Sequence, residues 1–242
     1  VITNREVIAL NQDVLGLQAQ VVSREGKRII LAKQIEVAQG KIRAVALFNG
    51  ESSATTMRIN FKDVELGGSV RVRDLWEQKN AGNYTDYYEV TVPAHGTAML
   101  RLVGETSFDK TKFEGEDAFL NNYNAVKVGN NARVSAKNGA SGGYLIGWLG
   151  NSASNWAEFR NVYSSAGGEY ELTVYYFTGQ SRNLSISVNE QEYPMSGLTA
   201  PNSNTLVSKS VNVTLKQGYN IIRLGNATGY APDIDKIELK AL

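Results

Sequence analysis

The stretch Tyr170-Glu171-Leu172-Thr173-Val174-Tyr175-Tyr176 decides the fold class of this 242-residue sequence. Large apolar or aromatic side chains stand at positions 170, 172, 174 and 176. Successive residues of a strand point to opposite faces, so these four side chains share one face. A period of two is typical of a β-strand that buries one side, and this stretch therefore predicts a strand.

The same alternation recurs in both halves of the chain, at residues 57–61, 88–92, 184–188 and 211–215. Residues 42–48 are apolar on both faces, as in a central strand that is covered on both sides. Turn-forming pairs such as Asn49-Gly50 and Gly82-Asn83 separate the strands. Many short strands at this spacing are typical of an all-β fold. We expect two antiparallel β-sandwiches in tandem, the second of them jelly-roll-like.

One short helix and one linker complete this division. Thr3 and Glu6 have the spacing of a capping box, a short apolar face follows at residues 7–10, and helical character fades near residue 12. Alternation lapses again over residues 105–112, which we interpret as a linker. The sequence thus predicts a first sandwich over residues 21–104 and a second over residues 113–242.

Composition excludes several classes of protein. The chain has 25 Lys and Arg against 24 Asp and Glu, which gives no basic field for a nucleic acid. It has no Cys, which excludes a thiol nucleophile and a cysteine zinc site, and its single histidine, His95, lies in an expected turn. No apolar run reaches the roughly 20 residues of a membrane span. The first residues do not read as a signal peptide, and we expect a mature or truncated product.

Three acidic residues form a candidate metal site. Glu114 and Glu116 are two residues apart, so on a strand both carboxylates would project from one face. Asp235 is in phase with Ile237 and Leu239, which places its carboxylate on the inward side. Buried carboxylates need compensation, and a hard cation such as calcium provides it. The alternative is a solvated acidic edge, with Asp235 capping a turn.

Aromatic and amide side chains form a candidate sugar site, because sugars stack on flat rings and bond to amides through their hydroxyls. Trp148 shares the face of Ile146, which favours a position in the core. Trp156 is out of phase with its apolar neighbours and is expected to face outward. Tyr230 lies in a predicted loop after Asn226, which is either a sugar-binding amide or a turn residue.

Motifs in the first half of the chain resemble the α-galactosidases of glycoside hydrolase family 27. Residues 4–16 resemble the segment that closes the catalytic barrel in that family, with Val14 where proline is usual. Residues 44–49, 72–76 and 92–96 resemble its C-terminal antiparallel domain. The resemblance implies that residues 1–20, with their short helix, are the terminal segment of a (β/α)8 barrel.

From Phe113 onward the sequence is similar to the calcium-containing carbohydrate-binding modules of families 35 and 6. The matching pieces are residues 114–116, 143–149, 155–159, 166–170, 218–222 and 232–237. The similarity implies a structural calcium ion held by Glu114, Glu116 and Asp235. It also implies a sugar site at the loop end of the sandwich, with Trp148 and Asn226.

One aromatic residue that is usual in these modules is missing near Thr205. Either Tyr230 or Trp156 substitutes for it, or the sugar site is weakened, relocated or lost. The catalytic aspartates of family 27 lie on barrel strands that would precede Val1, so the resemblance implies no catalytic residue in this chain.

We therefore expect a noncatalytic C-terminal region of an α-galactosidase-like glycoside hydrolase that is secreted or periplasmic. Its partners would be galactose-containing polysaccharide and its own catalytic barrel, with no nucleic acid and no membrane span. Two alternatives remain open. One is a small hydrolase that uses paired carboxylates, and the other is a structural or protein-docking sandwich that binds no sugar.

Overall fold

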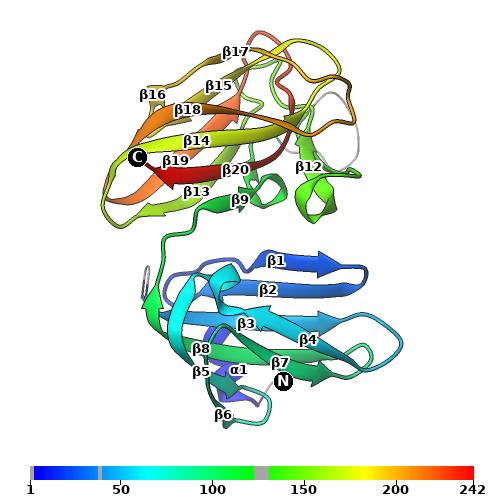
Figure 1. Cartoon of the computed structure of the whole chain (residues 1–242), viewed down its shortest axis with the longest axis vertical. Coiled ribbons are helices and arrows are strands. Elements are labelled where there is room, and N and C mark those ends of the chain that lie inside the picture. Colours follow the sequence, from blue (N-terminus) through cyan, green and yellow to red (C-terminus); the bar gives the residue numbers. More distant parts are fainter. Residues whose placement is uncertain (1–2, 38–39, 123–130) are drawn as a thin grey trace. The chain divides into compact units, whose positions relative to one another are not determined.

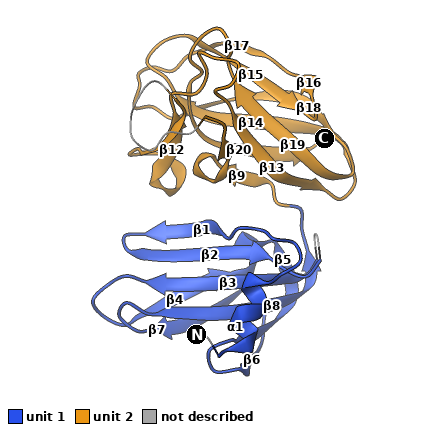
Figure 2. Ribbon diagram, turned by 180° about the vertical axis from the view of Figure 1, so that it is seen from behind, with its two compact units in different colours: residues 1–109 blue, residues 110–242 orange. Residues whose placement is uncertain are grey.

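The computed structural model describes residues 3–37, 40–122 and 131–242. The chain divides into two compact units, Val1–Asp109 and Lys110–Leu242, which Figure 2 shows in blue and orange. Both units consist mainly of antiparallel strands, as the alternating sequence predicts. In the described ranges no helix has the length and apolar character needed to cross a membrane.

In its described residues the first unit contains one α-helix, eight strands and one 3-10 helix, which Figure 1 labels where there is room. In chain order they are α1 (Arg5–Asn11), β1 (Gln20–Glu25), β2 (Arg28–Gln34), β3 (Ile42–Asn49), β4 (Thr55–Asn60), η1 (Phe61–Val64), β5 (Leu66–Asp74), β6 (Lys79–Tyr84), β7 (Tyr87–Val92) and β8 (Thr97–Ser107). A six-stranded sheet has the order β1-β2-β3-β8-β5-β6, and β4 pairs with β7 in a separate ribbon. Strand β3 lies inside the larger sheet, as its apolar character on both faces predicts.

The core of the first unit joins side chains from the large sheet and from the β4-β7 ribbon. Met57 and Ile59 of β4 are buried together with Leu47 of β3 and Leu100 and Leu102 of β8. These residues recur at every second position of their strands, so the period of two in the sequence is the period of burial. The residues between them form the outer faces.

Helix α1 is fixed to strands of the same unit by polar contacts. Asn4, and not Thr3, is its N-cap, since the Asn4 side chain accepts hydrogen bonds from the backbone N–H groups of Glu6 and Val7. Asn4 also donates to the carbonyl of Leu75, and Glu6 pairs with Arg73 of β5. The helix ends at Asn11, where the sequence predicted that helical character fades.

The second unit contains twelve strands and two 3-10 helices in its described part. In chain order they are β9 (Lys112–Glu114), η2 (Gly115–Asp117), β10 (Phe119–Leu120), β11 (Arg133–Ala136), η3 (Ser141–Gly143), β12 (Tyr144–Gly147), β13 (Ala157–Ser164), β14 (Gly168–Phe177), β15 (Arg182–Val188), β16 (Gln191–Glu192), β17 (Met195–Leu198), β18 (Val207–Leu215), β19 (Gly218–Gly225) and β20 (Asp233–Ala241).

These strands form two sheets that enclose one core. The first has the order β10-β13-β19-β15-β16, and the second has the order β11-β12-β20-β14-β18 with β9 on the edge of β20. The stretch at residues 170–176 lies in β14, and two of its alternating side chains, Leu172 and Val174, are fully buried. Ile222 and Leu224 of β19 meet them from the facing sheet. The second unit is therefore a β-sandwich.

The boundary between the units differs in detail from the linker predicted over residues 105–112. Strand β8 continues to Ser107, because Ser107 and Thr106 still pair with Leu66 and Gly67 of β5. Strand β9 then begins at Lys112. The polar character of residues 105–107 hid this extension, since edge residues of a strand need no apolar side chains.

Candidate functional site

The predicted metal-binding acids come together where β9 meets the last strand, β20. Lys236 of β20 pairs with Glu114, so the first and last strands of the unit are neighbours. Gly115 makes the close approach possible, since a Cβ there would lie 2.7 Å from the carbonyl oxygen of Asp235. Asp235 is fully buried, as its phase predicts.

One detail of the expected acidic site was wrong. Glu116 does not continue the strand of Glu114 but lies in the 3-10 helix η2, so the two carboxylates are brought together by a turn and not by strand alternation. Asp235 points inward as expected and is also the extra residue of a β-bulge, because Lys236 pairs with Tyr175 while Ile234 pairs with Tyr176.

Several carboxylate oxygens of this cluster have no hydrogen-bond partner among the described residues. Ser141 donates its backbone N–H to Asp235 Oδ1 at 2.7 Å and its hydroxyl to Glu114 Oε1 at 2.8 Å. Lys112 Nζ lies 2.6 Å from the same Glu114 oxygen. Among the described residues, the buried oxygens that find no hydrogen-bond partner are Glu114 Oε2, Glu116 Oε2, Asp117 Oδ2 and Asp235 Oδ2.

The electrostatics of the cluster follow from this crowding. Burial and the nearby charges of Glu114, Asp117 and Asp235 together raise the pKa of Glu116 to about 7, against the opposing effect of a backbone hydrogen bond. Burial likewise raises the pKa of Asp235 to about 6, although the Ser141 N–H opposes the shift. The fold therefore gathers four carboxylates at this edge, and the described residues leave one oxygen of each without a hydrogen bond.

The donor set has the chemistry of a site for a hard cation, which takes carboxylate and carbonyl oxygens. The orphaned oxygens fit that chemistry, because a buried carboxylate oxygen that receives no hydrogen bond from the described residues needs another source of compensation. Within the described ranges, however, no three acidic, histidine or cysteine side chains already stand at the spacing of metal ligands. Asp117 joins the cluster although the sequence reasoning did not select it; its position directly after Glu116 was the available signal.

The predicted sugar-binding ring of Trp148 is exposed, and its assignment to the core was wrong. Strand β12 ends at Gly147, and Trp148 takes a positive φ of 61°, so its side chain leaves the alternation of the strand. The side chain is 43% exposed. Because a bulky residue rarely adopts this conformation, the surrounding loop must hold it there.

A buried asparagine holds that loop. Asn155 donates hydrogen bonds to the carbonyl oxygens of Trp148, at 2.7 Å, and Gly150, at 2.6 Å, and accepts one from the N–H of Ala132. Asn155 is 2% exposed, which makes these bonds strong constraints on the backbone. Asn155 begins one of the stretches that resemble the carbohydrate-binding modules, but the sequence by itself predicted no role for it.

Tyr230 lies beside Trp148, as the sequence reasoning grouped them. Their ring centroids are 5.7 Å apart at an angle of 89°, and Tyr230 bridges to Gly150. The Asn151 amide nitrogen is 3.4 Å from the Tyr230 hydroxyl. The Arg133 guanidinium stacks over Trp148 at 4.8 Å from the ring centroid. We call Trp148, Tyr230, Asn151 and Arg133 the tryptophan loop site.

Of the other two predicted sugar-binding residues, Asn226 lies in the loop that carries Tyr230, whereas Trp156 lies apart from Trp148. The Asn226 side chain donates to the carbonyl of Asn183 and accepts from Thr228, so it organises the loop that carries Tyr230. Trp156 is half-buried, with its ring 5.9 Å from Phe119 and under the guanidinium of Arg223 at 4.1 Å. It therefore belongs to a separate cluster on the β13-β19 surface.

Glu158 is the centre of that second cluster. It is buried and binds Arg160 at 2.7 Å and Arg223 at 2.8 Å. Burial alone would raise its pKa, but the hydrogen bonds and charges of the two arginines outweigh burial and hold the pKa below its usual value. This cluster neutralises its own carboxylate, unlike the acids at β9 and β20.

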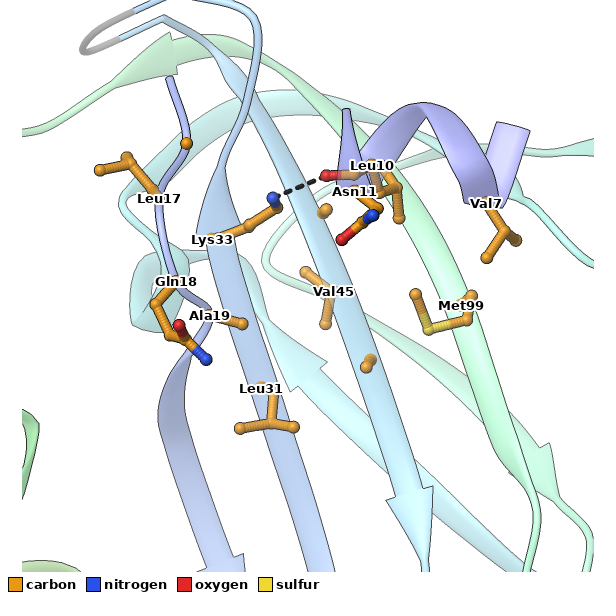
Figure 3. Close-up of a pocket in the computed structure, with 13 residues that line it drawn as sticks. Val7, Leu10, Asn11, Leu17, Gln18, Ala19, Leu31, Lys33, Val45 and Met99 are labelled. Atoms are coloured by element: carbon orange, nitrogen blue, oxygen red, sulfur yellow. Dashed lines mark hydrogen bonds between the residues drawn. The ribbon is translucent and has the colours of Figure 1, made fainter. Parts of the chain in front are cut away.

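The first unit carries an open hollow of about 450 Å³ on the outer face of its large sheet (Figure 3). Leu31 and Met99 line it from the strands, Val7 and Leu10 from helix α1, and Leu17 from the segment that follows. Lys33 crosses the hollow and donates to the carbonyl of Leu10 at 2.7 Å. An open apolar hollow of this kind suits a protein surface better than a small polar ligand.

Comparison with known proteins bears on both units. Residues 25–102 match the family described as the alpha galactosidase C-terminal beta sandwich domain. A probable alpha-galactosidase of Dictyostelium discoideum is 36% identical over 108 residues, which cover 42% of this chain and 27% of the relative. The chain spans about a quarter of the length of the curated relatives that it matches.

Many solved structures resemble the chain, and two of them bear on the second unit. The isomalto-dextranase of Arthrobacter globiformis T6, complexed with panose, is 22% identical with a TM-score of 0.58 and matches 98% of this chain and 42% of its own. This likeness shows the fold of both units. A family 35 carbohydrate-binding module from Clostridium thermocellum is 34% identical over 54% of this chain and 98% of its own, with a TM-score of 0.48.

The expected relationship to α-galactosidases is confirmed by the family match and by the curated relatives. The match covers β2 to β8, which are the strands of the first unit's core. Residues 25–102 are accordingly similar to the C-terminal β-sandwich domain of alpha-galactosidases.

Proposed function

We propose that this chain is the noncatalytic C-terminal region of an α-galactosidase-like glycoside hydrolase, and that its tryptophan loop site binds saccharide. The observation that carries the proposal is the exposed Trp148 ring, which a buried asparagine holds at positive φ beside Tyr230. Strain of this kind persists where the surroundings impose it, and it occurs preferentially at ligand sites.

The chemistry around the ring supports a sugar. A flat ring accepts the C–H face of a pyranose, while the Asn151 amide and the Tyr230 hydroxyl can both donate and accept hydrogen bonds to sugar hydroxyls. Asp233 on β20 lies close to the backbone N–H of Trp148. Burial raises the pKa of the Asp233 carboxyl, and the positive charges of Arg182 and Lys137 oppose that rise. In the parent enzyme such a site would raise the local concentration of galactose-containing polysaccharide around the catalytic domain.

Calorimetry with soluble galactosides, galactomannan and uronic acid oligomers tests this function. We expect binding to at least one of these glycans, and the Trp148→Ala variant should weaken it by roughly tenfold. Trp76→Ala is the matched control, since Trp76 is 37% exposed but lies in the first unit. A flat response to all the glycans, or equal weakening by both variants, would contradict the proposal.

The acidic cluster completes the proposal for the second unit. Glu114, Glu116 and Asp235 would hold a structural calcium ion, which supplies the positive charge that their orphaned oxygens lack. The ion would hold η2 against β20, two elements that are far apart in the sequence. Calcium titration of the chelator-treated protein, followed by isothermal calorimetry, tests this assignment; no heat of binding at any concentration would reject it.

The hollow of the first unit supports the second proposed partner, the enzyme's own catalytic barrel. Leu31, Met99 and Leu10 present apolar surface there on a sheet face that the unit's own ribbon leaves open. The match covers only 27% of the Dictyostelium relative's own length, so the remaining part of such an enzyme is available to cover it. Co-expression of the chain with the remaining part of its enzyme should give a stable complex, which Met99→Glu weakens.

The proposal gives this chain no catalytic role. Of the carboxylates that cluster at β9, η2 and β20, Asp235 is fully buried and the others are half-buried, and they do not line the hollow described in the first unit. Turnover of an aryl α-galactoside by the purified chain would contradict it. Export from the cytoplasm belongs to the same proposal, because polysaccharide substrates lie outside the cell, and fractionation of cells that express the full enzyme tests it.

A docking role for the second sandwich is the competing function. Phe119 and Ile221 are 42% and 44% exposed on the β10-β13-β19 sheet, which gives that surface apolar character. If glycan calorimetry is flat while Ile221→Glu abolishes association with the parent enzyme, this second function replaces the first.

A further inference from the structure

A second hollow lies at one end of the first unit, where the chain passes from one sheet to the other. Strand β6 belongs to the six-stranded sheet and β7 to the ribbon with β4, so the connecting residues 85–86 span the two layers. The hollow has a volume of about 630 Å³ and is lined by residues 83–89 and Ser69. Pockets for small ligands in proteins have volumes of roughly 300–1,000 Å³.

Three tyrosines form the aromatic part of this lining, Tyr84, Tyr87 and Tyr88. The rings of Tyr84 and Tyr88 are 4.9 Å apart and inclined at 60°, which makes a corner. Tyr88 packs against the core, whereas Tyr84 and Tyr87 are 36% and 41% exposed. The two exposed rings contribute little to the core, so folding alone does not account for both of them.

The positions of these rings are fixed before any ligand arrives. The Tyr84 hydroxyl donates to the carbonyl of Ala81 at 3.0 Å. The Arg58 guanidinium stacks over Tyr87 at 4.0 Å from the ring centroid, and Glu89 in turn binds Arg58 at 2.8 Å. Ordering of the rings within the free protein lowers the entropy that binding must overcome.

The polar part of the lining is available for hydrogen bonds. Asn83, Thr85 and Asp86 are exposed, and within the described ranges their side chains make no hydrogen bond to protein. An amide, a hydroxyl and a carboxylate together offer both donors and acceptors. Asp86 adopts a positive φ of 66° at the tip of the turn, and its carbonyl accepts from Phe61 N–H, which fixes its backbone.

From this combination we propose that the hollow, which we call the tyrosine hollow, is a binding site for a neutral saccharide. Flat rings suit the C–H faces of sugars, and sugar hydroxyls both donate and accept. The positive charge of Arg58 is neutralised by Glu89, so the hollow offers little attraction to an anion. This site goes beyond the tryptophan loop site: it lies in the other unit and shares no residue with it.

Hydrogen exchange measured by mass spectrometry on the full chain tests the proposal, with raffinose, panose and mannotriose as probes at roughly 10 mM. At least one probe should slow exchange of the amides in residues 83–89. Tyr84→Ala with Tyr87→Ala should weaken that protection by roughly tenfold, whereas Tyr87→Phe should retain most of it. Circular dichroism on each variant verifies the fold.

Matched variants separate this site from the one in the second unit. Tyr219→Ala removes a tyrosine that is 39% exposed in the second unit and should leave protection at residues 83–89 unchanged. Trp148→Ala should also leave it unchanged. Protection of residues 83–89 without any response near Trp148 would support the tyrosine hollow and contradict sugar binding at the tryptophan loop site. Protection near Trp148 without any response at residues 83–89 would support the tryptophan loop site and contradict the tyrosine hollow.

Two results would overturn the tyrosine hollow. One is the absence of protection at residues 83–89 with all three saccharides while the variants remain folded. The other is protection by the polycation spermidine alone that Asp86→Asn removes, since that result would assign the hollow to cations. Protection by saccharide that survives Asp86→Asn in large part would support the proposal.

Discussion

Two buried charged residues, one in each unit, are compensated in opposite ways. In the first, Arg43 is 2% exposed, donates to the carbonyls of Gly40 and Ile42 and lies 3.5 Å from Glu65. In the second, Asp235 is 0% exposed, and one of its oxygens has no hydrogen-bond partner. Burial of an ion is costly unless a partner compensates it. The first unit supplies that partner from its own chain, and the second leaves a carboxylate cluster that an external cation would complete.

Chelation should give the largest difference between the units. At free calcium about 1,000 times the dissociation constant, ligand binding stabilises the native state by about 4 kcal/mol, which removal of the ion would forfeit. Scanning calorimetry should then show the unfolding transition of the second unit lowered by roughly 10 °C, with that of the first unit unchanged. Equal transitions with and without chelator would remove the basis of the comparison.

Removal of the buried Arg43 side chain from the first unit should have the second-largest effect on stability. Arg43→Ala leaves backbone carbonyls and Glu65 without their donor, and we expect a loss of about 3 kcal/mol in the free energy of unfolding. Arg28→Ala breaks a pair with Glu25 whose side chains are 38% and 73% exposed, and should cost less than about 1 kcal/mol. Urea unfolding with and without calcium checks both variants, and calcium should change neither difference.

Removal of the Glu116 charge from the second unit should raise the free energy of unfolding, whereas Arg43→Ala lowers it in the first unit. The folded-state pKa of Glu116 is raised to about 7, above its ordinary value of 4.5, so the proton binds the folded protein more tightly. The stability associated with that proton is present below about pH 4.5 and is lost as the pH rises through about 7. Without calcium at about pH 8, Glu116→Gln should therefore stabilise the second unit by roughly 1–2 kcal/mol.

The same variant supplies its own control. At about pH 4.5 the effect of Glu116→Gln on stability should shrink towards zero, because the wild-type carboxyl is then largely protonated. The variant should also lose most of the stabilisation by calcium. Destabilisation of equal size at both pH values would show that Glu116 acts through packing rather than through its charge.

The smallest expected effect concerns the helix cap. Asn4→Ala removes the acceptor of two backbone N–H groups and the donor to Leu75, and should cost the first unit about 1 kcal/mol. Asn11→Ala at the other end of the helix should cost less than about 0.5 kcal/mol. Thermal unfolding of both variants, at any calcium concentration, measures the difference; equal losses would show that Asn4 is not the cap.

The sequence by itself determined the strands and the core of each unit. Residues 57–61 and 170–176 alternate in the sequence with the same period as in the structure, because the direction of a strand side chain is a local property of the backbone. The burial of Asp235 was predictable for the same reason. The resemblance of residues 4–102 to α-galactosidases likewise depends only on local motifs.

Tertiary structure alone decided the geometry of the sites. The exposure of Trp148 depends on hydrogen bonds from Asn155, seven residues along the chain, that hold the backbone at positive φ. The grouping of Glu116 with Asp235 depends on a turn at Gly115 that packs against the last strand. Alternation predicts which face of a strand a residue occupies, but bulges, turns and left-handed residues break it, and long-range contacts determine where they occur.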